Sequence, residues 1–141
     1  MSFLARVRDL CQGFLVLDTL VALEDGPQTI DDWEPDLSDV RDFSYANKNY
    51  RGRLYREYPD GARAEERALS TTASHANVMS VWLTEDALVS VLSDVGFEHV
   101  EKVVFPRHAE NWWSDPNEGR VLYVAWGRSR FSSAIFDPAD Q

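Results

Sequence analysis

The segment NYRGRLYREY, residues 49–58, holds the densest group of side chains that could do chemistry. Its candidate substrate contacts are two tyrosines, two arginines and a glutamate: Tyr50, Arg53, Tyr55, Arg56 and Glu57. Arginine can grip a carboxylate or a phosphate through two parallel hydrogen bonds, and tyrosine can stack on a planar molecule. Strand alternation predicts Tyr50 and Arg56 on one face, with Tyr55 on the other. Two interpretations stay open: a substrate-contacting strand, or an exposed ribbon with ordinary cross-strand ion pairs.

A second candidate site lies in the apolar run FLVLDTLVAL, residues 14–23, where Asp18 and Thr19 interrupt the hydrophobic residues. An acid that is buried in such a run needs a partner, because an unpaired charge is costly away from water. In open α/β sheets the carboxyl ends of the strands border the ligand crevice, which favours a crevice-lining role for both residues. The alternative is a structural hydrogen bond from neighbouring backbone.

Other reactive residue types give weaker signals. The three histidines, His75, His99 and His108, lack the spacing to cysteines or acids that zinc sites use, so we predict no metal. Cys11 lies on the apolar stripe of a helix and reads as a core residue. No nucleophile motif is present, and the catalytic residues stay unknown.

The hydrophobic pattern predicts the elements that must position these residues. A helix is expected over residues 2–12, and a buried strand over 14–23, because so continuous an apolar run is typical of a parallel sheet. Thr84 is a good N-cap for a second helix that ends at Gly96. Residues 99–105 and 120–126 read as two further strands. The region between residues 24 and 82 is polar and turn-rich, and we interpret it as an insertion.

Composition narrows the class of protein. With 141 residues and 44% hydrophobic content, the chain has the size of one domain. The net charge of −10 opposes generic binding to nucleic acid, although acids gather in residues 24–42 and arginines in residues 51–67. No apolar run is long enough to span a bilayer. A single cysteine excludes an internal disulfide, so we expect a cytoplasmic protein with no membrane partner.

Several segments read in order resemble one branch of the class I S-adenosylmethionine-dependent methyltransferases. These segments are LARVRDLCQGFLVLDTLVAL, NYRGRLYREY, NVMSVWLTEDALVSVLSDVGFEHVEKVVFPR and GRVLYVAWGR. The branch includes relatives of the enzyme that carboxymethylates the wobble uridine of transfer RNA. The resemblance implies an α/β fold, the C-terminal half of a Rossmann-like sheet. Its three strands would have the last one antiparallel and central, between residues 14–23 and 99–105.

The resemblance also implies a domain over residues 1–128, followed by a loosely ordered tail at 129–141. The insertion would fold back toward the active site, which adds Asn77 to the substrate contacts, while Trp82 reads as core packing. The family binds S-adenosylmethionine through a glycine-rich turn, and the seven glycines here are all isolated. We therefore expect an acceptor-binding half with little activity alone. Its partner would be a chain with the cofactor half, or a second copy of itself.

The alternative function is a non-catalytic binding or partner subunit that associates through the open edge of the strand at residues 14–23. The acceptor, whether a small molecule or transfer RNA, stays open, as does the choice between methyl and carboxymethyl transfer.

Overall fold

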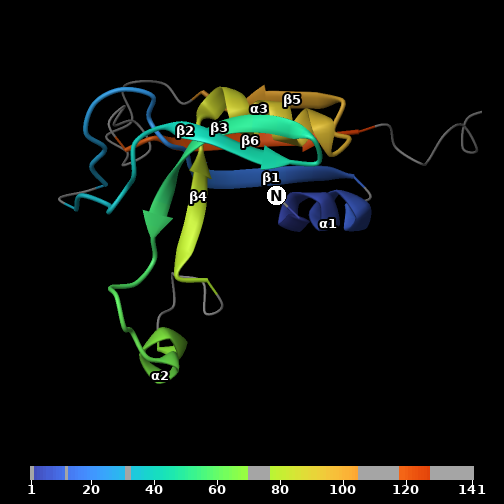
Figure 1. Ribbon diagram of the computed structural model, residues 1–141. Coiled ribbons are helices and arrows are strands. Elements are labelled where there is room, and N and C mark those ends of the chain that lie inside the picture. The colour runs from blue at the N-terminus through green and yellow to red at the C-terminus, as the bar shows by residue number, and fades with distance from the viewer. Residues whose placement is uncertain (1, 12, 31–32, 70–76, 105–117, 128–141) are drawn as a thin grey trace, which may run out of the picture.

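Two three-stranded sheets form the framework of the computed structural model, which describes residues 2–11, 13–30, 33–69, 77–104 and 118–127 (Figure 1). The first sheet has the order β1-β6-β5: β1 (Phe14–Leu20), β6 (Arg120–Trp126) and β5 (His99–Lys102). The second has the order β2-β3-β4: β2 (Arg41–Tyr45), β3 (Lys48–Arg56) and β4 (Met79–Leu83). The helices are α1 (Ser2–Leu10), α2 (Ala64–Ala68) and α3 (Glu85–Asp94).

The predicted fold class, a Rossmann-like α/β sheet, is wrong. All four strand ladders in the described residues are antiparallel, and the region expected as an insertion forms a second antiparallel sheet of its own. The order β1-β6-β5 is the expected one, but it belongs to a mostly antiparallel molecule. The error came from the apolar run of β1. That run is not covered on both faces, since Phe14 and Val16 are 66% and 54% exposed.

Several predicted elements are present. The first helix, the strand after it and the final strand at Arg120–Trp126 lie where the pattern places them. Helix α3 begins directly after Thr84, and Gly96 follows it with a φ of 105°, a value that favours glycine. Strands β2 and β4 were not predicted, because each has only five residues. Each also lies directly before a segment with a clearer pattern: β2 before residues 49–58, and β4 before the helix that follows Thr84. The expected tail at residues 129–141 lies outside the described part of the chain.

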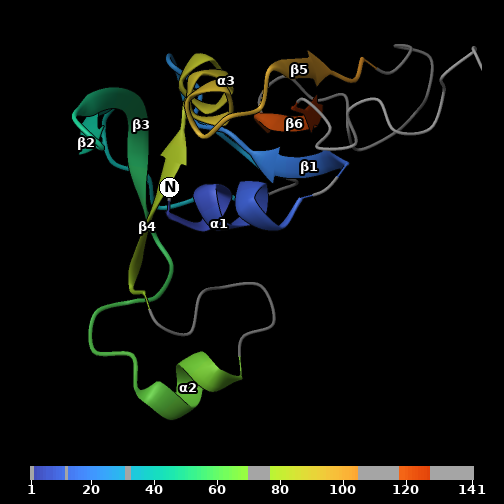
Figure 2. The ribbon, with the colours of Figure 1, turned by 90° about the vertical axis from the view of Figure 1, so that its right-hand side faces the viewer.

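The core lies between the first sheet and α3, which covers one face of that sheet (Figure 2). Val91 and Leu92 of α3 and the neighbouring Phe97 are the largest fully buried side chains. They pack in one cluster with alternate residues of β6, including Tyr123 and Ala125. Alternate side chains along β6 point to one face of the sheet, and the apolar side chains of α3 lie on one face of the helix. These two faces pack together in a single hydrophobic layer.

The two sheets meet at one point and then diverge. Ala22, just after β1, forms an isolated parallel bridge with Thr84, just after β4, and its N–H donates to the Leu83 carbonyl over 2.8 Å. Beyond this joint β4 leaves the first sheet steeply, and α2 lies at the far end of the second sheet (Figure 1). Helix α1 lies below β1 and beside β4 in Figure 2.

All the described helices are too short and too polar to cross a bilayer.

Candidate functional site

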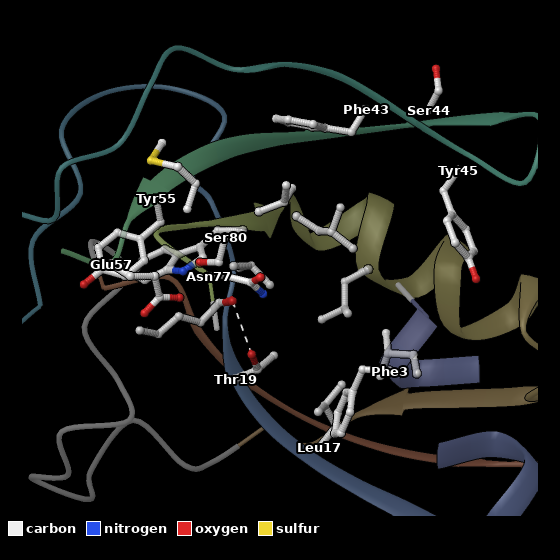
Figure 3. Close-up of a pocket in the computed structure, with 18 of the residues that line it drawn as sticks. Phe3, Leu17, Thr19, Phe43, Ser44, Tyr45, Tyr55, Glu57, Asn77 and Ser80 are labelled. Carbon is white, nitrogen blue, oxygen red and sulfur yellow. Dashed lines mark hydrogen bonds between the residues drawn. The ribbon is translucent and has the colours of Figure 1, made fainter. Parts of the chain in front are cut away.

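A cavity of about 1020 Å³ occupies the space between the diverging sheets (Figure 3). Residues from α1, β1, β2, β3, β4 and α3 line it, together with a few from the segments between these elements: Phe3, Leu4, Leu17, Thr19, Leu20, Val21, Trp33, Phe43, Ser44, Tyr45, Tyr55, Glu57, Asn77, Met79, Ser80, Val81, Trp82, Leu83 and Leu88. Ligand sites in proteins commonly enclose roughly 300–1,000 Å³ and are mostly apolar with a few polar groups. This cavity fits that description, so we treat it as the candidate site.

Three aromatic rings from separate segments form one wall. The rings of Tyr55 and Trp82 lie 4.8 Å apart between centroids, tilted by 36°. Trp33 meets Tyr55 edge to face, with centroids 5.9 Å apart and planes at 84°. Burial raises the pKa of Tyr55, and the nearby charge of Glu57 adds to that rise. The Tyr55 hydroxyl is therefore neutral at physiological pH and able to donate a hydrogen bond.

Polar side chains gather at one end of the cavity. Figure 3 shows Tyr55, Glu57, Asn77 and Ser80 close together there, with Thr19 on the opposite wall. The Ser80 hydroxyl oxygen is buried, and it has no hydrogen-bond partner among the described residues. A buried hydroxyl without a partner is uncommon in folded proteins, because leaving it unpaired costs about 1–3 kcal/mol. This end of the cavity is thus the part best suited to receive a polar ligand group.

The β3–β4 ladder explains why these groups meet. Tyr55 and Ser80 are direct partners in the antiparallel register, so their side chains project from the same face of the second sheet. Gly52, in the same ladder, permits the close approach of the two strands. A Cβ atom at position 52 would lie 2.5 Å from the Trp82 carbonyl oxygen. The small residue in β3 therefore helps to hold Trp82 in place.

Of the eight residues predicted for the site, four line the cavity: Thr19, Tyr55, Glu57 and Asn77. They come from three segments that are far apart in the sequence. The alternation predicted for residues 49–58 accounts for two of them, because Tyr55 and Glu57 project on the face opposite to Tyr50 and Arg56.

The other predicted substrate contacts have structural partners instead. The Tyr50 hydroxyl donates to Asp94 of α3 over 2.7 Å. Arg56 is held by two ion pairs, with Asp36 at 2.9 Å and with Asp60. Arg53 reaches two backbone carbonyls in residues 24–26 at 3.5 Å, and its Nε is buried with no hydrogen-bond partner in the described part of the chain. Arg51, Arg53 and Arg56 thus turn toward the acidic segment that precedes β2.

Asp18 does not reach the cavity. Both of its carboxylate oxygens accept hydrogen bonds from Arg120 of β6, over 3.0 and 2.7 Å. Its neighbour Thr19 projects on the opposite face of β1 and lines the cavity. Asp18 therefore has a partner, as expected for an acid in an apolar run. The partner is the Arg120 side chain on the adjacent strand, and not the backbone or a ligand.

Three residues of the aromatic wall and the polar end, Trp33, Ser80 and Trp82, are among the lining residues that the sequence did not assign to a site. Trp82 was interpreted as core packing, and Trp33 and Ser80 were not singled out. Trp33 lies in the acidic, turn-rich segment, where no periodicity predicts which way a side chain points. Ser80 gains its significance only from its register opposite Tyr55, and a pairing between distant strands is not encoded locally.

The described residues do not fit S-adenosylmethionine. A cofactor of this kind needs glycines whose backbone is open to the ligand. The glycines at which a Cβ would meet a close obstacle, Gly52, Gly119 and Gly127, face atoms of the protein itself. Gly13, Gly26 and Gly61 have open space around them, but they are isolated and none lines the cavity. Within the same residues, histidine, cysteine and acidic side chains form no group of three suited to a metal ion.

Comparisons of the chain with protein-family models, with curated proteins and with solved structures found no match.

Proposed function

We propose that this chain supplies the acceptor-binding site of an S-adenosylmethionine-dependent methyltransferase. The proposal rests on the resemblance stated above and on one structural observation. The predicted substrate contacts Tyr55, Glu57 and Asn77 line a single cavity together with Thr19, which was predicted to line the crevice. The resemblance supplies the reaction class, and the cavity supplies a place for the acceptor.

Two features of the cavity support binding of an acceptor there. It has the size of a small-molecule site and an aromatic wall against which a planar group can pack. Glu57 is the one charged residue among the described lining residues. Its carboxylate would accept the proton that an acceptor hydroxyl loses on methylation, which is the usual role of a positioned base.

The cofactor would be bound elsewhere, because the described residues form no site for it. We infer that a partner chain brings S-adenosylmethionine to the mouth of the cavity, and that both act in the cytoplasm. The chain by itself is then a binding component, with little or no transferase activity.

Reconstitution tests this proposal. Extracts of source cells that lack the gene are incubated with methyl-tritiated S-adenosylmethionine, and the purified chain is then added back. We expect the chain to restore a labelled organic product, and Tyr55→Ala to fail to do so. The matched control is Leu10→Ala, at a residue of α1 that is 82% exposed and does not line the cavity.

An unchanged set of labelled products after add-back would contradict the proposal. Micromolar binding of S-adenosylmethionine to the chain alone, measured by isothermal titration, would contradict the inference that a partner brings the cofactor.

A second function, a non-catalytic binding subunit, is favoured by the position of β1. This strand is the edge of its sheet in the described structure, and it exposes Phe14 and Val16. Exposed apolar edges promote association with other chains. A stable homodimer in light scattering, together with no effect on methyl labelling, would support this function over the first.

A further inference from the structure

The cavity runs along the open edge of β4. Every residue of this strand, Met79–Leu83, lines it. Successive side chains of a strand point to opposite faces of the sheet, so a cavity on one face would meet only alternate residues. Contact with the whole of β4 therefore places the cavity against the edge of the strand. On that edge the described chain adds no further strand to the second sheet.

The hydrogen bonds of the β3–β4 ladder show which backbone groups of β4 face the cavity. The Thr84 N–H donates to the Arg51 carbonyl over 3.0 Å, across this ladder. Residues of an antiparallel strand turn their N–H and C=O groups alternately toward and away from the neighbouring strand. Positions 80 and 82 thus bond to β3, whereas the backbone groups of Met79 and Val81 point away from it. Within the described residues, no hydrogen bond reaches the N–H or C=O of Met79 or Val81.

The same edge of β4 already pairs with another extended segment at its C-terminal end. There the Ala22 N–H donates to the Leu83 carbonyl over 2.8 Å. The next two outward-facing positions along the edge, Val81 and Met79, continue this row of donors and acceptors, and both residues are exposed. An unpaired strand edge is a template for another extended backbone. The cavity thus offers main-chain partners that match a polypeptide in the extended conformation.

The walls beside this edge are suited to apolar side chains. On the second sheet, the rings of Tyr55 and Trp82 lie 4.8 Å apart between centroids. Leu4 of α1 and Leu17 of β1 line the cavity from the side of the first sheet. Side chains of an added strand alternate between its two faces. A segment with apolar residues at alternate positions would therefore pack every second side chain against one wall.

The charge around the cavity favours a basic segment. Trp33, which lines the cavity, belongs to the acidic stretch of residues 24–42. Its neighbour Glu34 is exposed and forms no ion pair within the described part of the chain. The whole chain carries a net charge of −10, which attracts positively charged partners at longer range. Lysine or arginine at the ends of the segment would complement this charge.

We propose that the cavity binds an extended, basic polypeptide segment of a partner, which adds to β4 as a fourth strand of the second sheet. The backbone of the segment bonds to the N–H and C=O groups of Met79 and Val81, and alternate apolar side chains pack against Tyr55 and Trp82. The inference does not rest on the methyltransferase function. It gives the non-catalytic alternative a site and a class of partner. In a methyltransferase, the acceptor would be a side chain of the bound segment.

Amide hydrogen exchange, followed by NMR, tests the pairing with the probe peptide acetyl-Lys-Val-Thr-Val-Thr-Val-Lys-amide. In the chain alone, the N–H groups of Met79 and Val81 should exchange faster than those of Ser80 and Trp82, which bond to β3. The bound peptide should slow exchange at Met79 and Val81 about tenfold or more. The N–H of Val16 is the control, because it points outward from β6 but lies outside the cavity.

Two results of this measurement would overturn the proposal. One is an unchanged exchange rate at positions 79 and 81 in the presence of saturating peptide. The other is no binding of the peptide up to a concentration of about 1 mM, which corresponds to a free energy of binding of only about −4 kcal/mol.

Backbone N-methylation of the peptide supplies a matched ligand control, since it removes N–H donors and keeps every side chain. One isomer is methylated at its valines and the other at its threonines. An added strand turns only alternate N–H groups toward β4, so we expect one isomer to bind about tenfold more weakly than the other. Equal binding of the two isomers, whether tight or weak, would contradict strand addition at one edge.

The basic character of the segment is tested by the peptide with glutamate in place of both lysines. It should bind more weakly than the lysine peptide at low salt, and the difference should shrink in about 1 M salt, where the Debye length falls to about 3 Å. Equal or tighter binding of the glutamate peptide at low salt would refute the basic character.

A pair of proline variants assigns the pairing to β4. Val81→Pro removes an N–H that points away from β3, so the β3–β4 ladder keeps its hydrogen bonds. We expect this variant to bind the peptide about tenfold more weakly. Val16→Pro makes the same change on the outward side of β1, outside the cavity, and should bind like wild type. Equal effects of the two variants would count against pairing at β4.

The peptide comparisons use the wild-type chain, so they decide the proposal even if Val81→Pro fails to fold. Light scattering distinguishes the partner segment from a second copy of the chain. A dimer in which the Val81 N–H is already protected would show that a second copy occupies the edge, and the proposal would be wrong.

The binding measurements are also independent of the add-back experiment. Peptide binding without restored methyl labelling would refute the methyltransferase function and leave strand addition standing. Restored labelling by a chain that does not bind the peptide would refute strand addition alone.

Discussion

The Tyr50 hydroxyl donates a 2.7 Å hydrogen bond to a carboxylate oxygen of Asp94 and so connects β3 of the second sheet to α3. Lys48, two residues before Tyr50, forms an ion pair with the other oxygen of the same carboxylate. This junction holds the second sheet against the helix that covers the first. It also makes the contact between the two sheets sensitive to the protonation of one acid.

The first prediction concerns the pH dependence of stability at this junction. Hydrogen bonds from Lys48 and then Tyr50 lower the pKa of Asp94 below its ordinary value of 3.8. A carboxyl whose folded pKa lies below its unfolded value stabilises the protein above the unfolded pKa, and this contribution is lost as the pH falls through the folded pKa.

We therefore expect the difference in Tm between wild type and Asp94→Asn to be largest near pH 7 and to shrink as the pH falls from 4 toward 2, about the range over which such carboxyls titrate. Thermal melts followed by circular dichroism measure it. Asp86→Asn, an exposed acid at the start of α3, is the control. A difference in Tm that stays constant with pH would show that the hydrogen bonds do not lower the pKa of Asp94.

The second prediction concerns Gly52. Alanine at this position would place its Cβ 2.5 Å from the Trp82 carbonyl oxygen and 3.2 Å from the Leu83 Cα, both backbone atoms. The strands must separate, so we expect Gly52→Ala to destabilise the protein by about 1–3 kcal/mol, the usual cost of overpacking.

Urea unfolding measures this loss, and Gly13→Ala is the matched control, since no atom lies within 4 Å of the Cβ built there. Equal stabilities of the two variants would mean that β3 and β4 are not as close as the structure has them.

The third prediction concerns the core. Leu92 is fully buried between α3 and the first sheet, with 0% of its surface exposed. Leu92→Ala should lower the free energy of unfolding by about 2–5 kcal/mol, the range found for such truncations in cores. Leu10→Ala makes the same chemical change at a residue that is 82% exposed, and it should cost less than about 0.5 kcal/mol. Chemical denaturation of both variants checks the difference.

The fourth prediction concerns Gln28, a buried polar residue that satisfies three backbone groups. Its amide nitrogen donates to the carbonyls of Val21 and Glu118, each over 2.8 Å, and its amide oxygen accepts from the Leu23 N–H over 3.1 Å. Gln28→Leu leaves all three without this partner and should cost at least about 1–3 kcal/mol.

Gln28→Glu keeps the shape but replaces the donor by a carboxylate oxygen that faces two carbonyls. We expect it to destabilise the protein more at pH 7 than at pH 4, because protonation of the glutamate restores a donor. Asp25→Asn, at an exposed position nearby, serves as the control. No change of the Gln28→Glu deficit with pH would argue against the two donated hydrogen bonds.

Local patterns in the sequence predicted most of the helices and strands, but not how the strands pair. The N-cap at Thr84 and the glycine after α3 predicted where that helix begins and ends, nearly to the residue. The apolar run of β1 was ambiguous, because hydrophobic composition alone does not tell a strand buried on both faces from an edge strand that exposes Val16. The fold class depended on that distinction, and the prediction of it was wrong.

The candidate site was predictable only in part for the same physical reason. Alternation within β3 separated Tyr55 from Tyr50, which needs only the period of a strand. Ser80 and Trp82, the neighbours of Tyr55 in the cavity, lie on β4. No local pattern in the sequence predicts that β4 pairs with β3. The partners of the arginines also depended on contacts between residues distant in sequence, since Arg56 pairs with Asp36 and Arg53 reaches the carbonyls of Glu24 and Gly26.

The bridge between Ala22 and Thr84 has a consequence for how this protein can vary. The segment between these residues leaves the first sheet and returns to it at neighbouring positions, where the Ala22 N–H meets the Leu83 carbonyl. Between these two anchor points the segment also contributes Tyr50 and Leu83 to the core cluster that contains α3, so changes at those two positions reach the first sheet as well. Tyr55, Ser80 and Trp82 lie in the same segment but outside that core cluster, so variation in the lining of the cavity is separable from variation in the core.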